Sequence, residues 1–274
     1  MESAVAAAKT LNSRNIEVSL DLLGESVHVP EETYRARDDV LDVLDAIAAS
    51  GVVGNVSVKL TQLGLDIDRA LCVENMRAIL TRASEHGIFV RIDMESSAYT
   101  ERTLDVFTHD LHPEFGELTG VVIQGYLRRS GGDVERMISL GARVRLCKGA
   151  YAEPVSVAFG TRQEVDASYL TLMKRLLTDG KYPAIATHDE RLIDQALEFV
   201  ECHNVSPDRF EFQMLYGVRR DLQQALREKG YNVRVYVPFG NNWYPYLMRR
   251  LAERPANVVF MVASMTKERL SRTR

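Results

Sequence analysis

The sequence of 274 residues has little of several residue types, and each shortage excludes a class of protein. It has three cysteines, Cys72, Cys147 and Cys202, an odd number without the spacing of metal ligands. This predicts free thiols in a reducing compartment. The 34 basic and 38 acidic side chains nearly cancel, with a formal net charge of −4 and no long run of one sign. We therefore expect no nucleic-acid-binding surface.

The sequence also has no apolar run of the about 20 residues that a membrane-spanning helix needs. The charge-free stretch 46–58 is too short and is interrupted by glycine, serine and asparagine. The N-terminus has Glu2 in place of a basic region, and the apolar run Ala4–Ala8 is too short for a signal peptide. We expect a cytoplasmic protein.

The glycines exclude two nucleotide-binding motifs. None of the 17 glycines is separated from another by a single residue, so the dinucleotide fingerprint G-x-G-x-x-G is absent, and the phosphate-loop pattern is absent too. No linker or low-complexity segment interrupts the chain, which indicates one domain over residues 1–274.

What the sequence does contain is one repeated unit: a short run rich in β-branched residues, a polar loop and an amphipathic helix pattern. Strands are predicted at 16–20, 55–60, 88–93, 120–124, 142–146, 184–187, 210–214 and 233–237. Helices are predicted at 31–49, 68–86, 133–140, 164–177, 190–201 and 220–229, several of them ending before Gly51, Gly87, Gly141, Gly180 or Gly230.

Alternating strands and helices predict an α/β fold with parallel strands, either an open doubly wound sheet or a closed barrel. Eight strands favour a (βα)8 barrel over about residues 16–262, preceded by a short extension, residues 1–15. In such a barrel the active site forms where the strands end. The residues there are polar or ionisable: Asp21, Lys59, Asp93, Gln124, Arg145, Lys148, Thr187, His188, Gln213 and Tyr236.

The segment after the last strand reads as a helix. On it Tyr246, Arg249, Arg250 and Glu253 share one face, because they are three or four residues apart. Paired guanidinium groups suit bidentate capture of a carboxylate or phosphate. The alternative is a solvated helix face held by Arg–Glu pairs.

The segment Tyr246–Glu253 resembles the tyrosine, arginine-pair and glutamate signature of the proline dehydrogenases. Further segments agree with that family in the same order: Ser57–Leu60, Arg145–Tyr151, Ala186–His188 and Arg234–Pro238. The resemblance implies a barrel that binds FAD and oxidises L-proline to Δ1-pyrroline-5-carboxylate. It also implies that electrons pass to a quinone-type acceptor and that a pyrroline-5-carboxylate dehydrogenase is a candidate partner.

Residue by residue, the resemblance implies that Arg249 and Arg250, with Lys59, hold the proline carboxylate, beside Tyr236 and Tyr246. Asp93 and Arg145 match catalytic positions. The positions that match FAD contacts, some of them in weaker agreement, are Met94, Gln124, Lys148, Gly149, Ala150, Arg162, Thr187, His188, Gln213 and Glu253.

The chemistry suits these residues. Hydride transfer from proline C5 to flavin N5 needs cations that orient the carboxylate and stabilise the reduced flavin. So many cations need a counter-charge, which Asp93 and Glu253 can supply by pairing with arginines. The bulk of Tyr236 is a hypothesis for the rejection of ring-hydroxylated proline. The sequence departs from the family at Ala152, where an aromatic residue usually follows the tyrosine of the Lys-Gly-Ala-Tyr motif.

Other interpretations remain open at this point. A Schiff-base aldolase would use Lys59 or Lys148 as its nucleophile, and a binding barrel would have no chemistry at all. His109 and His112 form a potential metal pair, but we expect them to lie in a loop and expect no metal site. The basic run Lys267–Arg274 is either a solvated tail or a peripheral contact with anionic lipid.

Overall fold

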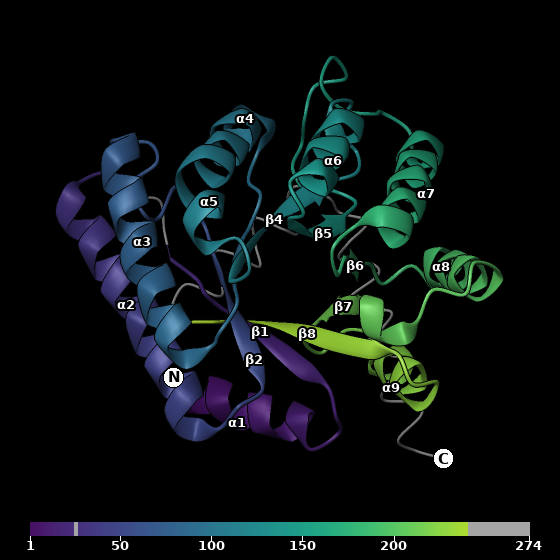
Figure 1. Ribbon diagram of the computed structural model, residues 1–274, viewed down its shortest axis with the longest axis horizontal. Helices are drawn as coiled ribbons and strands as arrows, with labels where there is room; N and C mark the ends of the chain where they lie inside the picture. The colour runs from purple at the N-terminus through teal and green to yellow at the C-terminus, as the bar shows by residue number, and fades with distance from the viewer. Residues whose placement is uncertain (25–26, 241–274) are drawn as a thin grey trace.

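The strand-rich segments close into a barrel in the computed structural model, which describes residues 1–24 and 27–240 (Figure 1). All neighbouring strands are parallel and follow chain order, with the last strand beside the first. This confirms the predicted (βα)8 barrel. The strands are β1 Glu17–Leu22, β2 Gly54–Val58, β3 Val90–Ile92, β4 Thr119–Gln124, β5 Arg143–Cys147, β6 Ala184–Ala186, β7 Glu211–Leu215 and β8 Asn232–Phe239.

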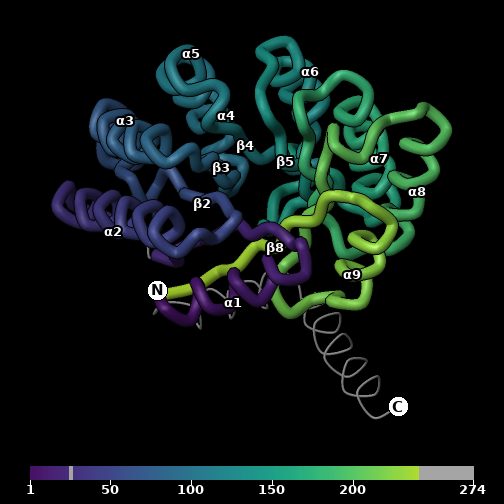
Figure 2. The backbone as a smooth tube through the Cα atoms, turned by 60° about the horizontal axis from the view of Figure 1, so that its bottom comes forward, coloured from purple at the N-terminus to yellow at the C-terminus, as the bar shows by residue number. Residues whose placement is uncertain are grey.

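Helices surround the barrel, as Figure 2 shows from another side. The predicted ones are confirmed to within three residues at each end. Gly51 and Gly87 adopt the left-handed conformation at their helix ends as expected, whereas Gly180 is extended at φ −73°. The helices that follow the strands are α2 Pro30–Ser50, α3 Arg69–His86, α4 Ser97–Asp105, α5 His112–Phe115, α6 Ser130–Ser139, α7 Arg162–Asp179, α8 Glu190–Cys202 and α9 Arg220–Glu228.

A further helix, α1 (Glu2–Asn12), was not predicted from the sequence. It packs against β1 and β8, beside α2 (Figures 1 and 2). Its buried residues Ala4, Ala8 and Leu11 are spaced as one helical face. This spacing was a signal in the sequence, but small alanines make it a weak one.

The prediction that His109 and His112 lie in a loop is wrong. His109 belongs to a π-helical segment, Val106–Leu111, and His112 begins α5. The segment is helical because Leu104, Phe107 and Leu111 recur at helical spacing and are completely buried. Within the described ranges, no group of three or more His, Cys, Asp or Glu side chains is placed to hold a metal ion.

The apolar core lies between the barrel and the helices, while the inside of the barrel is polar. Along β5, Val144 and Leu146 are buried in the apolar core. The alternate residue Arg145 contacts Ser19 of β1, a strand that is not its neighbour in the sheet, so this contact crosses the barrel interior. Barrels of this class usually fill that space with branched apolar residues. The polar interior brings charged groups up to the ends of the strands.

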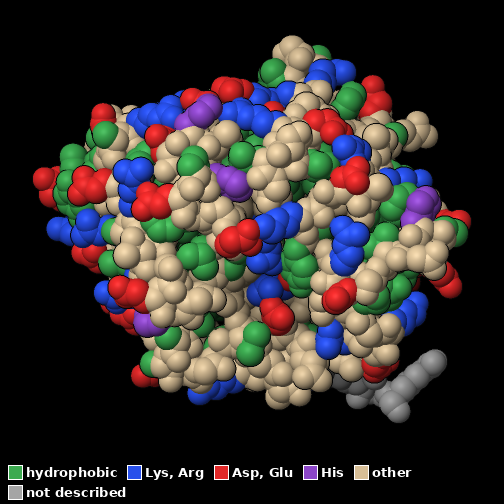
Figure 3. Space-filling model, viewed as in Figure 1, with side chains coloured by type: hydrophobic (Ala, Val, Ile, Leu, Met, Phe, Trp, Pro, Cys, Tyr) green, Lys and Arg blue, Asp and Glu red, His purple; other side chains and the backbone are tan. Residues whose placement is uncertain are grey.

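The predicted free thiols are confirmed for Cys72, Cys147 and Cys202. Burial raises the pKa of Cys72 to about 12, so its thiol is unreactive. No helix in residues 1–24 and 27–240 is long and apolar enough to span a bilayer. On the face that Figure 3 shows, basic and acidic side chains are interspersed, and neither sign forms a continuous patch.

Candidate active site

A cluster of ionisable side chains lies where β1, β2, β3, β5 and β8 end; we call it the strand-end cluster. It comprises Asp21, Lys59, Asp93, Arg145 and Tyr236. Lys59 Nζ lies 2.9 Å from Asp21 Oδ2 and 4.0 Å from Asp93 Oδ2. The structure thus brings four predicted site residues into one cluster: Lys59, Asp93, Arg145 and Tyr236. Asp21, which the sequence analysis named only as a strand-end residue without a specific role, joins them.

Arg145 is held by three side chains in the strand-end cluster. Its Nη1 donates to Asp93 Oδ1 at 2.7 Å, and its Nη2 donates to the hydroxyls of Ser57 at 3.2 Å and Ser19 at 3.3 Å. The residue is 5% exposed, and its Nε has no hydrogen-bond partner among the described residues. The predicted pairing of Asp93 with an arginine is therefore observed, and the guanidinium retains donor capacity.

Tyr236 covers this pair. Its ring centroid lies 5.3 Å from the Arg145 guanidinium carbon, and its hydroxyl lies 2.5 Å from Asp21 Oδ2 and 2.9 Å from Asp93 Oδ2. A phenol has one proton to donate, so it can serve only one of these carboxylates at a time. The hydroxyl of Tyr236 therefore links Asp21 of β1 to Asp93, which follows β3.

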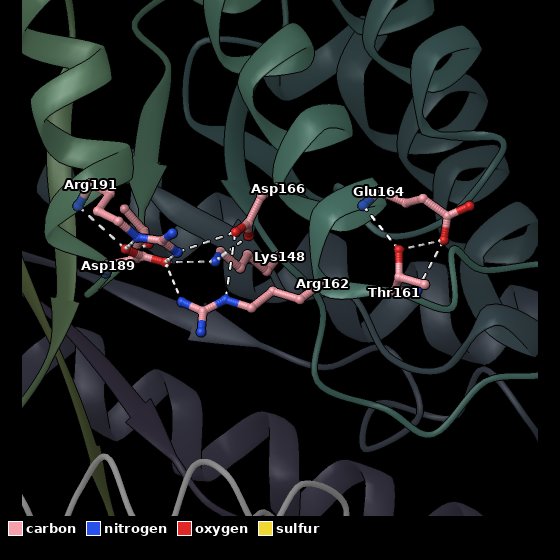
Figure 4. Close-up of polar contacts among 8 residues, drawn as sticks. Lys148, Thr161, Arg162, Glu164, Asp166, Asp189 and Arg191 are labelled. Carbon is pink, nitrogen blue, oxygen red and sulfur yellow. Dashed lines mark hydrogen bonds and ion pairs between the residues drawn. The ribbon is translucent and has the colours of Figure 1, made fainter.

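A second charge cluster lies at the ends of β5 and β6; it comprises Lys148, Arg162, Asp166, Asp189 and Arg191 (Figure 4). Lys148 Nζ lies 2.6 Å from Asp166 Oδ1 and 3.0 Å from Asp189 Oδ2, and the two arginines also pair with Asp189. Burial raises the pKa of Asp189, but hydrogen bonds from Arg191 and Lys148 outweigh it and lower that pKa well below its usual range. Three cations face two carboxylates, which leaves one positive charge in excess.

Buried amides and a histidine complete the mouth of the barrel. Gln124 Nε2 donates to the Glu95 carbonyl at 2.8 Å, and Gln213 donates to Glu211. His188 Nε2 accepts from the Leu215 amide at 2.8 Å. Burial, with a smaller contribution from Arg219, lowers the pKa of His188 to about 4. The imidazole is therefore neutral at pH 7.

Position 149 requires glycine for a local structural reason, in addition to the cofactor contact predicted for Gly149. Its φ is +115°, and a Cβ there would lie 2.1 Å from the Tyr126 ring, so a side chain cannot be accommodated. Next to it Ala150 is half-buried, and Thr187 Oγ1 accepts from the Asp189 amide at 3.1 Å. Met94 is buried in the apolar core. Tyr246, Arg249, Arg250 and Glu253 lie outside the described residues.

Comparison with known proteins identifies the family of this barrel. The family model described as proline dehydrogenase matches residues 4–263. The chain belongs to the proline dehydrogenase family. It is 42% identical to proline dehydrogenase 2 of Bacillus subtilis over 266 residues, and 43% identical to proline dehydrogenase of Deinococcus radiodurans over 271 residues. Each alignment covers 97% of this chain and 87% of the relative.

A solved structure agrees with the proline dehydrogenase assignment. Proline utilization A from Bdellovibrio bacteriovorus, inactivated by N-propargylglycine, is 28% identical with a TM-score of 0.85. The match covers 91% of this chain and 31% of that one, so this chain spans about a third of that longer protein.

Sequence reasoning found most of the strand-end groups of this family member and the pairing of Asp93 with an arginine, but it missed their other partners. Asp21 was visible as a strand-end residue, and Ser19 and Ser57 precede Asp21 and Lys59 by two positions, on the same face of their strands. Asp166 and Asp189 gave no sequence signal of their own. They are recognised only through their contacts with Lys148.

Proposed function

We propose that this member of the proline dehydrogenase family oxidises L-proline to Δ1-pyrroline-5-carboxylate with FAD as cofactor, as the first step of proline catabolism. Family membership over residues 4–263 supports the reaction. The observation that carries the proposal is Arg145, a buried guanidinium at the strand ends that pairs with Asp93 and keeps an unused donor at Nε. Such a group can stabilise negative charge that develops during a reaction.

The donor set at the barrel mouth fits FAD. Gln124 and Gln213 offer buried amides, and the second charge cluster offers Lys148 and Arg162 with an excess positive charge for a diphosphate. We assign Met94, Gly149, Ala150, Thr187, His188 and Glu253 to the same cofactor site. When bound, FAD supplies the two-electron acceptor, with hydride moving from proline C5 to flavin N5.

We assign the substrate carboxylate to Lys59 together with Arg249 and Arg250. Orientation by several cations brings C5 to a defined position, which is the entropic part of catalysis. Arg249→Ala and Arg250→Ala are expected to raise the KM for proline by about tenfold or more, since a charge-assisted hydrogen bond contributes about 1.5–3 kcal/mol. Unchanged KM values in both variants would remove this assignment.

The strand-end cluster can also hold a proton. Proline binds as an ammonium ion, and hydride loss requires the neutral amine. The carboxylate oxygens of Asp21 and Asp93 that face the Tyr236 hydroxyl are positions where the released proton can reside. In this proposal Arg145 compensates the negative charge of Asp93, and Lys59 compensates that of Asp21.

We further propose that a quinone-type acceptor reoxidises the enzyme and that a pyrroline-5-carboxylate dehydrogenase consumes its product. The product is a cyclic imine in equilibrium with an aldehyde, which is the kind of substrate that a dehydrogenase oxidises. Free thiols at Cys72, Cys147 and Cys202 support a cytoplasmic location, with peripheral membrane contact at most.

The direct test is spectroscopic. The purified protein should be yellow, and L-proline should bleach its flavin absorbance in the absence of oxygen, whereas D-proline should not. A colourless protein that neither binds FAD nor responds to L-proline would rule out the proposed function. The aldolase alternative predicts borohydride trapping of a carbonyl substrate on a lysine. The structure disfavours it, because Lys59 and Lys148 are both ion-paired and a Schiff base requires a neutral amine.

A further inference from the structure

Arg91 is a fully buried cation with no carboxylate partner among residues 1–24 and 27–240. It is 0% exposed, and its Nη1 donates to the backbone carbonyls of Val121 and Arg143. Its Nε and Nη2 atoms have no hydrogen-bond partner within those ranges. A buried charge without a counter-ion destabilises a fold, so its presence requires a reason.

The barrel is built to accommodate this arginine. Arg91 on β3 is in register with Gly120 on β4, which is in register with Arg143 on β5. A Cβ at Gly120 would lie 2.7 Å from Arg91 Nη1 and 2.2 Å from the Arg143 carbonyl. The absence of a side chain on β4 therefore lets the guanidinium cross that strand and reach β5.

The charge of Arg91 lies directly below the strand-end cluster. Arg91 on β3 precedes Asp93, which follows that strand, by two residues. Arg91 is also in register with Ser57, whose hydroxyl accepts from Arg145. Burial lowers the pKa of Arg91 well below its usual range, and the neighbouring Arg145 and Arg143 lower it further. Arg91 and Arg145 are thus like charges inside the barrel, and Glu211 on β7 acts on Arg91 in the opposite direction.

The other interior arginines differ from Arg91. Arg145 pairs with Asp93, and Arg234 pairs with Glu211 and Glu17. Arg143 lies over the rings of Phe89 and Tyr182, with its guanidinium carbon 4.3 and 4.5 Å from their centroids. Arg91 also lies over the Phe89 ring, at 4.7 Å, so the difference is that Arg143 is only half-buried whereas Arg91 is fully buried. Within the described ranges Arg91 is thus a fully buried arginine that no carboxylate pairs with at ion-pair distance, although Glu211 favours its charged form from farther away.

We propose that Arg91 is a positioning residue for the proposed reaction: its buried charge, which forms no ion pair, acts through Arg145 and makes the strand-end site selective for anions. The anions are the substrate carboxylate and the reduced flavin, so the inference rests on the proposed function. The low dielectric of the barrel interior extends the reach of this charge, as it does for preorganised charges in active sites.

The test compares Arg91→Met and Arg91→Gln, which remove the charge, with Arg91→Lys, which keeps it. Arg175→Met, on the outer surface of α7, is the matched control for loss of an arginine. The first readout is the dissociation constant of cyclopentanecarboxylate, which has the ring and the carboxylate but no oxidisable amine. The neutral cyclopentanecarboxamide reports ring binding alone.

Both neutral variants should bind cyclopentanecarboxylate about tenfold more weakly and the carboxamide with unchanged affinity, because only the anion senses the lost charge. The second readout is the two-electron midpoint potential of bound flavin, which should fall by about 30 mV, equivalent to a tenfold change in relative affinity for the reduced form. Arg91→Lys and Arg175→Met should remain within twofold of the wild type in affinity.

A folded neutral variant with unchanged carboxylate affinity and flavin potential would overturn the proposal. Failure of both neutral variants to fold would also overturn it, because Arg91 would then serve the fold alone. Neither result can be confused with failure of the proposed function. If that function is wrong, the wild type itself will lack flavin and will show no proline-dependent bleaching.

Discussion

Lys59 and Asp21 form an ion pair at the mouth of the barrel, with 2.9 Å between Nζ and Oδ2. The Asp21 side chain is 1% exposed and that of Lys59 14%, so most of this pair is shielded from water. In the proposed function Lys59 contributes to holding the substrate carboxylate. It therefore has two roles, one in compensating Asp21 and one in binding, and the two can be separated by experiment.

Lys59→Met should lower the free energy of unfolding by about 3 kcal/mol, because it leaves the buried Asp21 carboxylate without its cation. It should also raise the KM for proline by about tenfold or more. Adding Asp21→Asn removes the uncompensated charge, so the double variant should recover at least half of the lost stability while its KM stays high. Urea unfolding and steady-state kinetics measure the two effects. Recovery of a wild-type KM in the double variant would show that Lys59 does not bind substrate.

Tyr236 combines a bulky ring with a hydroxyl that faces Asp21 and Asp93. Tyr236→Ser should reduce the preference for proline over 4-hydroxyproline, measured as the ratio of kcat/KM values, because it opens the space next to the ring. Tyr236→Phe is the matched control: it keeps the ring and should leave the preference unchanged, while lowering kcat/KM for both substrates about tenfold through the lost hydrogen bond. An unchanged preference in Tyr236→Ser would exclude the bulk hypothesis.

The strand ends could be predicted from the sequence because the carboxyl ends of parallel strands converge on one face of a barrel. Asp93 and Arg145 were assigned to one site on this basis, and they are 2.7 Å apart. Their remaining partners follow from closure of the barrel. Arg145 reaches Ser19, which is 126 residues away in the sequence, and no local pattern relates those two positions.

The barrel interior was the least predictable part. Several strands alternate polar and apolar residues, a pattern that is typical of a sheet with one solvated face. The polar positions in these strands include Arg91, Glu211 and Arg234. In a closed barrel that second face is enclosed, so the polar residues are buried and must pair with one another. Glu211 and Arg234 do so, and Arg91 does not.

Glu211 on β7 and Arg234 on β8 form a buried ion pair, with side chains 2% and 7% exposed and 3.0 Å between Arg234 Nε and Glu211 Oε1. Burial raises the pKa of Glu211, but Arg234 and Gln213 outweigh it and lower the pKa to about 2. Arg234→Met should lower the free energy of unfolding by about 3–5 kcal/mol because Glu211 is left unpaired.

The control for this pair is the exposed one between Arg175 and Glu135, for which Arg175→Met should leave stability close to that of the wild type. Adding Glu211→Leu to Arg234→Met should restore much of the lost stability, since neither charge then remains buried. Urea unfolding of the three variants measures these differences. Equal destabilisation by the buried and the exposed arginine substitutions would show that the buried pair has no special weight.

His188 makes stability depend on pH above the range in which the carboxylates titrate. Its pKa falls from 6.5 to about 4 on folding, because the buried ring is desolvated and the nearby Arg219 disfavours a second positive charge. Between pH 6.5 and pH 4 the unfolded chain therefore binds a proton at His188 that the folded chain does not, so stability falls as the pH falls. The loss of unfolding free energy approaches about 3 kcal/mol at pH 4.

Replacing the imidazole by an amide, in His188→Gln, should remove this pH dependence. The difference in unfolding free energy between wild type and variant should then narrow steadily from pH 7 to pH 4.5, while a constant difference would show that the neutral imidazole is not what the folded state requires.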